Sequence, residues 1–126
     1  MTDTKKQILV IDDDPDITRM LQLILEYHGF EIKRAHGTAQ GMQMLANMVP
    51  DMVLIDYMMP HFTGLELCSY VRRDPRVEHV PIIVYSALNT PEAIDASMKA
   101  GATRFVQKTV GNDELVGVIR EVLATG

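Results

Sequence analysis

The stretch LVIDDDPDIT, residues 9–18, passes from an apolar run through a cluster of acids to a proline. A continuous apolar run is typical of a strand that is covered on both faces of a parallel sheet. Proline is favoured in the first turn of a helix, and apolar side chains follow it at helical spacing from Ile17 onward. The stretch therefore predicts a buried strand, a short acidic turn and an amphipathic α-helix.

The same order is found along the rest of the chain. Strand-like runs at residues 8–11, 30–35, 52–55, 82–85 and 104–107 are separated by stretches of helical period. The runs FEIKRA (30–35) and RFVQ (104–107) mix polar and apolar residues, as edge strands do, whereas the others are apolar throughout. Short strand–helix units of this kind predict an α/β fold with a doubly wound, five-stranded parallel sheet.

Several helix ends can be predicted from single residues. Gly29 and Gly101 are placed to end helices, and Thr90 precedes a proline as an N-cap residue does. An apolar stripe at residues 42–49 predicts a helix that Pro50 stops. The sequence TGLE, residues 63–66, is a capping box at the start of a further helix.

Composition sets limits on location and partners. The chain has 126 residues, 47% of them hydrophobic, and these predict one domain with a core at about residues 7–123 and no effector domain. A net charge of −5 and the lack of a basic run argue against direct nucleic-acid binding. No apolar segment is long enough for membrane insertion, and the single Cys68 suits the reducing cytoplasm, where we expect the protein.

The aspartates of residues 12–16 divide into two groups. Asp14 precedes the proline that opens a helix, so we expect it to cap that helix, and Asp16 lies in the first turn, where its charge suits the helix dipole. Asp12 and Asp13 directly follow the first strand. The carboxyl ends of strands are where open parallel sheets bind ligands, so these two are candidates for chemistry.

Polar residues follow the other central strands in the same way. Asp56, Ser86 and Lys108 each stand at the end of a predicted strand. Any one of them alone has an ordinary explanation as a turn residue or an exposed amine. Together with the acids after the first strand they would place three carboxylates, a hydroxyl and an amine on one rim of the sheet, the edge at which its strands end. Close carboxylates repel one another unless a cation joins them, and oxygen ligands favour Mg²⁺.

In these motifs the chain resembles the CheY-like receiver domains of two-component response regulators. The resemblance covers residues 7 to about 123. It rests on the acid pair at 12 and 13, the D-x-x-M-P-x-x-x-G pattern of residues 56–64, the Ser-Ala pair at 86 and 87, and Lys108. It implies a flavodoxin-like fold with strand order 2-1-3-4-5, which would make Asp12, Asp13 and Asp56 neighbours.

The resemblance also implies a function. Asp56 would accept a phosphoryl group from a sensor histidine kinase, a phosphotransfer protein or a small acyl phosphate. Mg²⁺ would be held by Asp13 and Asp56, by the backbone carbonyl of Met58, and through water by Asp12. The protein would be a signalling phosphoacceptor, not an enzyme with a separate substrate, and it would control an output partner that the sequence does not identify.

Two further roles follow from the same resemblance. Ser86 and Lys108 would hold phosphoryl oxygens, and Ser86 would act together with Phe105 as a conformational switch. A permanently buried strand residue is the alternative for Phe105. The family has proline after its lysine, whereas this chain has Thr109. Because a cis bond costs about 2.5–4 kcal/mol without proline, we expect Lys108–Thr109 to be trans.

Two other functions are compatible with parts of the sequence. The letters DPDIT, residues 14–18, match the D-x-D-x-T motif of haloacid-dehalogenase-type phosphatases, in which Asp14 would be the nucleophile. A degenerate receiver that only binds partners is the second alternative. It would lack an acid or the lysine, and none of these is missing here.

Overall fold

The sheet determines the arrangement of the whole molecule. A computed structural model describes residues 5–58 and 64–125. Its strands are all parallel and lie in the order β2-β1-β3-β4-β5. The strands are β1 (Gln7–Ile11), β2 (Glu31–Ala35), β3 (Met52–Ile55), β4 (Ile82–Ser86) and β5 (Arg104–Gln107). The predicted fold class and strand order are confirmed, and the two mixed runs form the edge strands β2 and β5.

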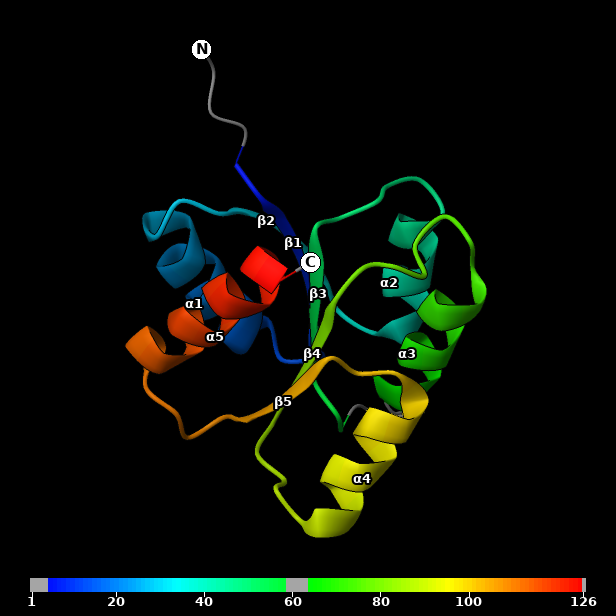
Figure 1. The fold of residues 1–126 in the computed structure, drawn as a ribbon. Helices are drawn as coiled ribbons and strands as arrows, with labels where there is room; N and C mark the ends of the chain where they lie inside the picture. Colours follow the sequence, from blue (N-terminus) through cyan, green and yellow to red (C-terminus); the bar gives the residue numbers. More distant parts are fainter. Residues whose placement is uncertain (1–4, 59–63, 126) are drawn as a thin grey trace.

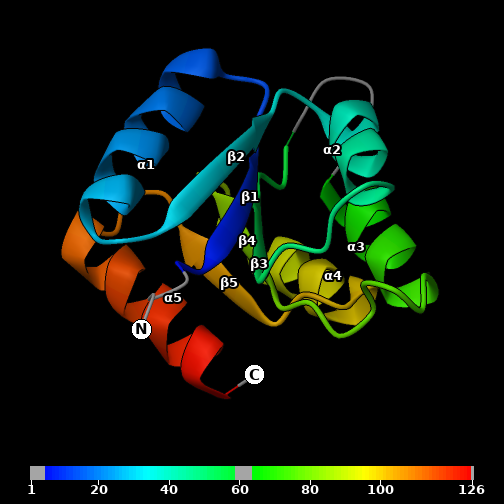
Figure 2. The same cartoon turned by 90° about the horizontal axis from the view of Figure 1, so that it is seen from above.

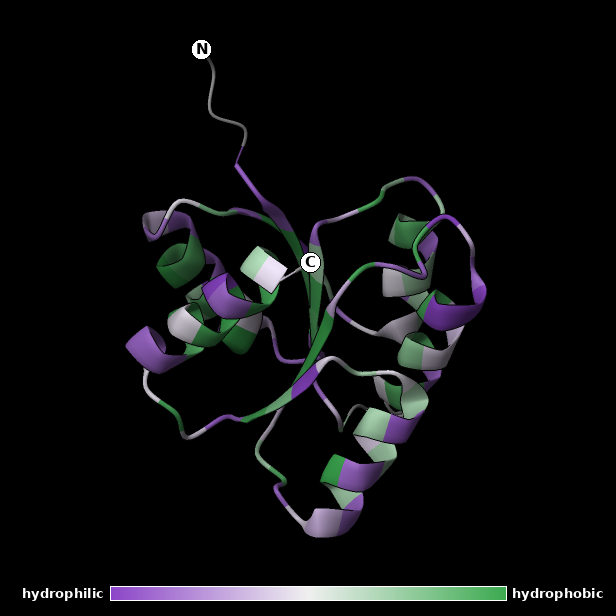
Figure 3. Cartoon of the chain, viewed as in Figure 1, coloured by the Kyte–Doolittle hydropathy of each residue, from purple (hydrophilic) through white to green (hydrophobic). Residues whose placement is uncertain are grey.

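Helices cover both faces of the sheet. They are α1 (Pro15–Tyr27), α2 (Thr38–Leu45), α3 (Gly64–Arg73), α4 (Pro91–Ala100) and α5 (Asn112–Thr125). Figures 1 and 2 show α1 and α5 on one face and α2, α3 and α4 on the other. Figure 3 shows the hydrophobic strands in the middle and the hydrophilic residues on the outer helix surfaces.

Alternation along each strand divides the core into two. Ile8 and Val10 of β1 belong to the core beneath α1 and α5, whereas Leu9 and Ile11 belong to the core beneath α2 and α3. The same alternation continues past the ends of the strands, because successive side chains point to opposite faces. It therefore determines on which side of the rim each polar residue lies.

Most of the predicted helix ends are confirmed. Asp14 caps α1 by accepting hydrogen bonds from the backbone N–H groups of Asp16 and Ile17. The hydroxyl of Thr90 accepts the N–H of Ala93 at the start of α4. After α1 and α4 the chain passes through left-handed glycines, with φ of 94° at Gly29 and 113° at Gly101. Only glycine adopts this conformation without a steric cost.

The predicted extent of α2 was wrong. The helix ends at Leu45, and residues 46–50 form a turn and an irregular segment in which Val49 is half-exposed. Proline disfavours helical backbone in the residue before it, so Pro50 explains why Val49 is not helical but not why the helix ends as early as Leu45. For the capping box at residues 63–66, Thr63 lies outside the described residues. Across the described ranges, each helix is too short or too polar to span a bilayer.

Candidate functional site

The carboxyl ends of the central strands meet at one edge of the sheet. β1 and β3 are neighbours with Ile11 opposite Ile55, so the residues that follow them also lie side by side. Asp12, Asp13 and Asp56 each offer a carboxylate oxygen, and these oxygens all lie within 4.8 Å of one another. The strand order thus brings together the three acids that the sequence analysis singled out.

Asp56 has charged neighbours of both signs. Its side chain is buried, and its Oδ1 atom accepts the backbone N–H of Met58 at 3.3 Å. Burial raises the pKa of the Asp56 carboxyl above its ordinary value; the charge of Asp12 adds to this rise, and the ammonium of Lys108 opposes it. An anion at this position therefore needs positive charge close to it.

Lys108 supplies positive charge to two of the acids. Its Nζ atom donates a hydrogen bond to Asp12 Oδ2 at 3.0 Å and lies 3.4 Å from Asp56 Oδ2. Burial alone would lower the pKa of Lys108, but the hydrogen bond with Asp12 and the charges of both carboxylates outweigh it and raise the pKa. The amine therefore stays an ammonium. The Lys108–Thr109 peptide bond is trans, as predicted, since the described chain contains no cis bond.

The acid cluster has the chemistry of a divalent-cation site. Asp12 is buried and its Oδ1 accepts the N–H of Asp14 at 3.0 Å, whereas Asp13 is exposed. Three carboxylates facing one ammonium leave an excess of negative charge, and the ligand atoms are hard oxygens. These are the features that Mg²⁺ prefers, so the residues present fit that ion.

A cleft opens above Asp56. It has a volume of about 300 Å³ and is lined by Asp56, Met58, Ser86, Ala87, Leu88 and Lys108. Ser86 is buried, and its Oγ atom accepts the N–H of Leu88 at 3.1 Å. Met58 and Leu88 are 56% and 38% exposed, so apolar side chains form the mouth of a cleft whose floor is charged.

Phe105 lies apart from this cleft. It is half-buried on β5, where it packs against the core beneath α2, α3 and α4. It occupies the opposite face of the sheet from Val106, in agreement with strand alternation. Its place beside α4 is compatible with either of the two roles considered from the sequence.

Two neighbours of the site had no assigned role in the sequence. A Cβ atom at Gly64 would overlap the backbone carbonyl oxygen of Asp56, so the glycine allows α3 to start directly against Asp56. Its place at the end of the D-x-x-M-P-x-x-x-G pattern was a signal for this. Tyr85 is the second neighbour: its ring centre lies 5.8 Å from Lys108 Nζ. From the sequence, Tyr85 could be recognised only as a residue of a strand.

Asp14 is engaged elsewhere. Because its carboxylate caps α1, it is not free to act as the nucleophile that the phosphatase motif would require. The acids and the lysine of the rim are all in place, which also removes the basis of the degenerate alternative.

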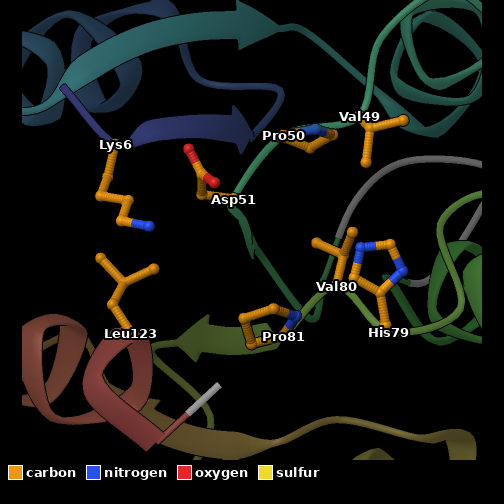
Figure 4. Close-up of a pocket in the computed structure, with 8 residues that line it drawn as sticks. All are labelled: Lys6, Val49, Pro50, Asp51, His79, Val80, Pro81 and Leu123. Atoms are coloured by element: carbon orange, nitrogen blue, oxygen red, sulfur yellow. The ribbon is translucent and has the colours of Figure 1, made fainter. Parts of the chain in front are cut away.

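A second cavity lies at the opposite, amino-terminal edge of the sheet (Figure 4). Its volume is about 190 Å³, and its walls are largely the apolar side chains of Val49, Pro50, Val80, Pro81 and Leu123. Figure 4 shows Lys6 and His79 on opposite sides of the cavity, with Asp51 between them. Asp51 already accepts the N–H of Gln7 at 2.7 Å, and among the described residues no acid cluster like that of the rim is found at this edge.

The fold and the acidic rim define a class, the phosphoacceptor-type α/β signalling domains, and comparison with known proteins identifies the family. The model of the response regulator receiver domain matches residues 8–120. The chain therefore belongs to the response regulator receiver domain family.

Curated relatives include larger proteins. The chain is 31% identical over 118 residues to the phosphate regulon transcriptional regulatory protein PhoB of Pseudomonas aeruginosa, covering 94% of this chain and 52% of that protein. It is 28% identical over 117 residues to the DNA-binding dual master transcriptional regulator RpaA of Synechocystis, covering 93% and 48%. The chain thus spans about half the length of these relatives.

Solved structures agree with this assignment. A putative response regulator from Chloroflexus aurantiacus is 30% identical, with a TM-score of 0.91 and coverage of 96% of this chain and 99% of that one. The response regulator TrrA of Thermotoga maritima, solved in complex with Mg²⁺-BeF, is 30% identical with a TM-score of 0.82 and coverage of 92% and 97%.

Proposed function

We propose that residues 7–123 act as one phosphoacceptor switch, in which Asp56 receives a phosphoryl group. The observation that supports this most directly is the surroundings of Asp56: a buried carboxylate at the floor of a cleft, beside an ammonium and two further acids. Such a carboxylate can act as a nucleophile if the charge of the incoming group is neutralised.

In the reaction, an Asp56 oxygen forms a bond to phosphorus while the bond from phosphorus to the donor breaks. The donor is a phosphohistidine of a sensor kinase or phosphotransfer protein, or a small acyl phosphate, and it leaves with the bonding electron pair. Lys108 and Ser86 hold phosphoryl oxygens in this proposal. Asp12, Asp13, Asp56 and the Met58 carbonyl hold Mg²⁺, which supplies charge neutralisation when bound.

The product would be a labile acyl phosphate, suited to a reversible signal. Movement of Ser86 toward the phosphoryl group, followed by Phe105, would alter the surface near α4 and so control a protein partner. The net charge of −5 argues against direct contact with nucleic acid through these residues. The reduced, buried Cys68 is in keeping with a cytoplasmic location.

The test is incubation of the protein with acetyl phosphate and Mg²⁺, followed by intact-mass measurement and mapping of the modified residue. We expect one phosphoryl group, on Asp56, and none when EDTA removes the metal. Labelling at a different residue would contradict the proposal. Repeated turnover of a phosphomonoester would instead favour a phosphatase.

A further inference from the structure

The side chain of Lys108 has to cross the sheet to reach its partner. Lys108 follows β5 and Asp12 follows β1, and strands β4 and β3 lie between them. Nevertheless the ammonium lies 3.0 Å from Asp12 Oδ2. The aliphatic stem of the lysine therefore runs inward over the end of β4, and whatever β4 presents there determines where the ammonium lies.

β4 presents an aromatic ring at that point. Tyr85 is opposite Val106 of β5. Val106 lies two residues before Lys108, so Tyr85, Val106 and Lys108 are on the same face of the sheet. On its other side, the register of Ile55 with Val84 places Tyr85 next to Asp56. Tyr85 thus stands between the origin of the lysine and the acids that it reaches, in one row across the sheet.

The contact between the ring and the ammonium is close and shielded. Lys108 Nζ lies over the Tyr85 ring at 5.8 Å from its centre. The tyrosine is 7% exposed and the lysine side chain 20% exposed. A cation within about 6 Å of an aromatic centre is attracted by the negative face of the ring, and more strongly where water is excluded.

We infer that Tyr85 is a positioning residue for phosphoryl transfer, in which the face of its ring holds the Lys108 ammonium in place above Asp56. An aliphatic residue here would also be apolar enough for the core beneath α1 and α5 but would have no attraction for a cation. When a divalent ion draws the carboxylates toward itself, the neutral ring remains as a partner of the ammonium. The inference rests on the proposed function of Asp56 and adds a residue to it.

The kinetic test compares rates of labelling by acetyl phosphate at saturating Mg²⁺. Tyr85→Leu should be slower by about two- to fivefold, the factor that a cation–π contact is worth. Tyr85→Phe keeps the ring and should retain the rate of the parent protein. Ile83→Ala is the matched control, because it truncates a buried residue of the same strand face without touching Lys108. It should also label at the parent rate.

A second measurement does not depend on phosphorylation. The ring current of Tyr85 should shift the NMR signals of the Lys108 ε-methylene protons upfield in metal-free protein. The shift should persist in Tyr85→Phe and vanish in Tyr85→Leu. If Tyr85→Leu fails to fold, Tyr85→Met, with its flexible apolar side chain, takes its place in both measurements.

Any of the following outcomes would overturn the inference: a parent-like rate for Tyr85→Leu, equal slowing in Ile83→Ala, or a Lys108 signal that is insensitive to residue 85. Slowing in Tyr85→Phe as large as in Tyr85→Leu would also overturn it, because the hydroxyl and not the ring face would then be responsible. Absence of labelling in the parent protein would refute the proposed function instead, and the NMR comparison would still decide the contact.

Discussion

Strand β3 has an aspartate beside each of its ends, and the two carboxylates are used in opposite ways. At the amino end, Asp51 and Gln7 exchange two hydrogen bonds: Asp51 N–H donates to the Gln7 carbonyl at 2.8 Å, and Asp51 Oδ2 accepts the Gln7 N–H at 2.7 Å. At the carboxyl end, the backbone N–H of Asp56 donates to Ile11, and its side chain takes no part in the ladder.

The difference separates a structural acid from a reactive one. The Asp51 carboxylate accepts the Gln7 N–H in place of a backbone carbonyl and so extends the pairing of β1 with β3. This hydrogen bond gives the carboxylate a partner. Asp56 is left with the cleft, the neighbouring acids and the Lys108 ammonium. Its raised pKa shows that this environment disfavours the anion when no further cation is present. The residue type is the same, but only one end has capacity left for a ligand.

The largest expected effect is on labelling by acetyl phosphate, when Asp56 and Asp51 are each replaced by asparagine. Asp56→Asn should abolish labelling by acetyl phosphate, because the amide cannot act as the nucleophile. Asp51→Asn should be labelled at the rate of the parent protein, because Asp51 lies at the far end of the strand. Intact-mass measurement over time distinguishes the two, and full labelling of Asp56→Asn would break the comparison.

A smaller effect is expected at the exposed acid of the rim. Asp13→Asn should weaken Mg²⁺ binding by about a hundredfold, since loss of a direct ligand costs at least as much as loss of an outer partner. It should leave the protein as stable as the parent or more so, because clustered anions repel one another. Calorimetric titration and urea unfolding measure both properties. Asp16→Asn, in the first turn of α1, is the control and should bind Mg²⁺ normally.

The apolar side chains at the mouth of the cleft should lengthen the lifetime of a phosphoryl group on Asp56. Hydrolysis of an aspartyl phosphate needs an oriented water, and neither the Met58 nor the Leu88 side chain can orient one by a hydrogen bond, as an amide can. Met58→Asn and Leu88→Gln should therefore speed the loss of the phosphoryl group by about tenfold. Met58→Leu keeps the apolar side chain and should decay as slowly as the parent. If both polar variants decay at the parent rate, these residues do not slow hydrolysis.

The smallest effects concern stability. Asp51→Ala removes the partner of the Gln7 N–H and should lower the free energy of unfolding by about 1–2 kcal/mol. Urea unfolding measures this change, and a phosphorylation rate equal to that of the parent would show that the damage is confined to the amino edge. Unchanged stability would mean that water replaces the carboxylate without cost.

At the carboxyl end of β3, substitution of the aspartate should raise the stability of the protein instead of lowering it, and the size of this effect should depend on pH. Because the folded-state pKa of Asp56 is raised above 3.8, the folded protein binds more protons than the unfolded chain in the window just above that value. The stability of the metal-free protein therefore falls as pH rises through this window. Asp56→Asn should be more stable than the parent at neutral pH, and the gain should shrink as pH falls toward 3.8. A gain that is independent of pH would contradict this.

The residues of the rim could be predicted from the sequence because the ends of the strands can be recognised in it. Apolar runs that stop at Ile11 and Ile55 locate the carboxyl edge, and the strand order then makes Asp12 and Asp56 neighbours. The caps at Asp14 and Thr90 were likewise determined by local chemistry. These features depend on residues close together in the chain.

What was missed depends on contacts between distant strands. Tyr85 read as an ordinary strand residue, because its relation to Lys108 requires the register of β4 with β5. The pairing of Asp51 with Gln7 joins residues 44 positions apart and leaves no local pattern. The end of α2 at Leu45 was misjudged for a different reason: the apolar stripe continues to Val49, beyond the last helical residue.

The ion pair of Lys108 with Asp12 also has a consequence during synthesis. The two residues are 96 positions apart, so the ammonium joins the acids only after all the residues between them have been made. A nascent or truncated product that stops before β5 carries all three carboxylates but no lysine to balance them. Under the proposed function, such a product lacks the ammonium that would hold a phosphoryl oxygen beside Asp56.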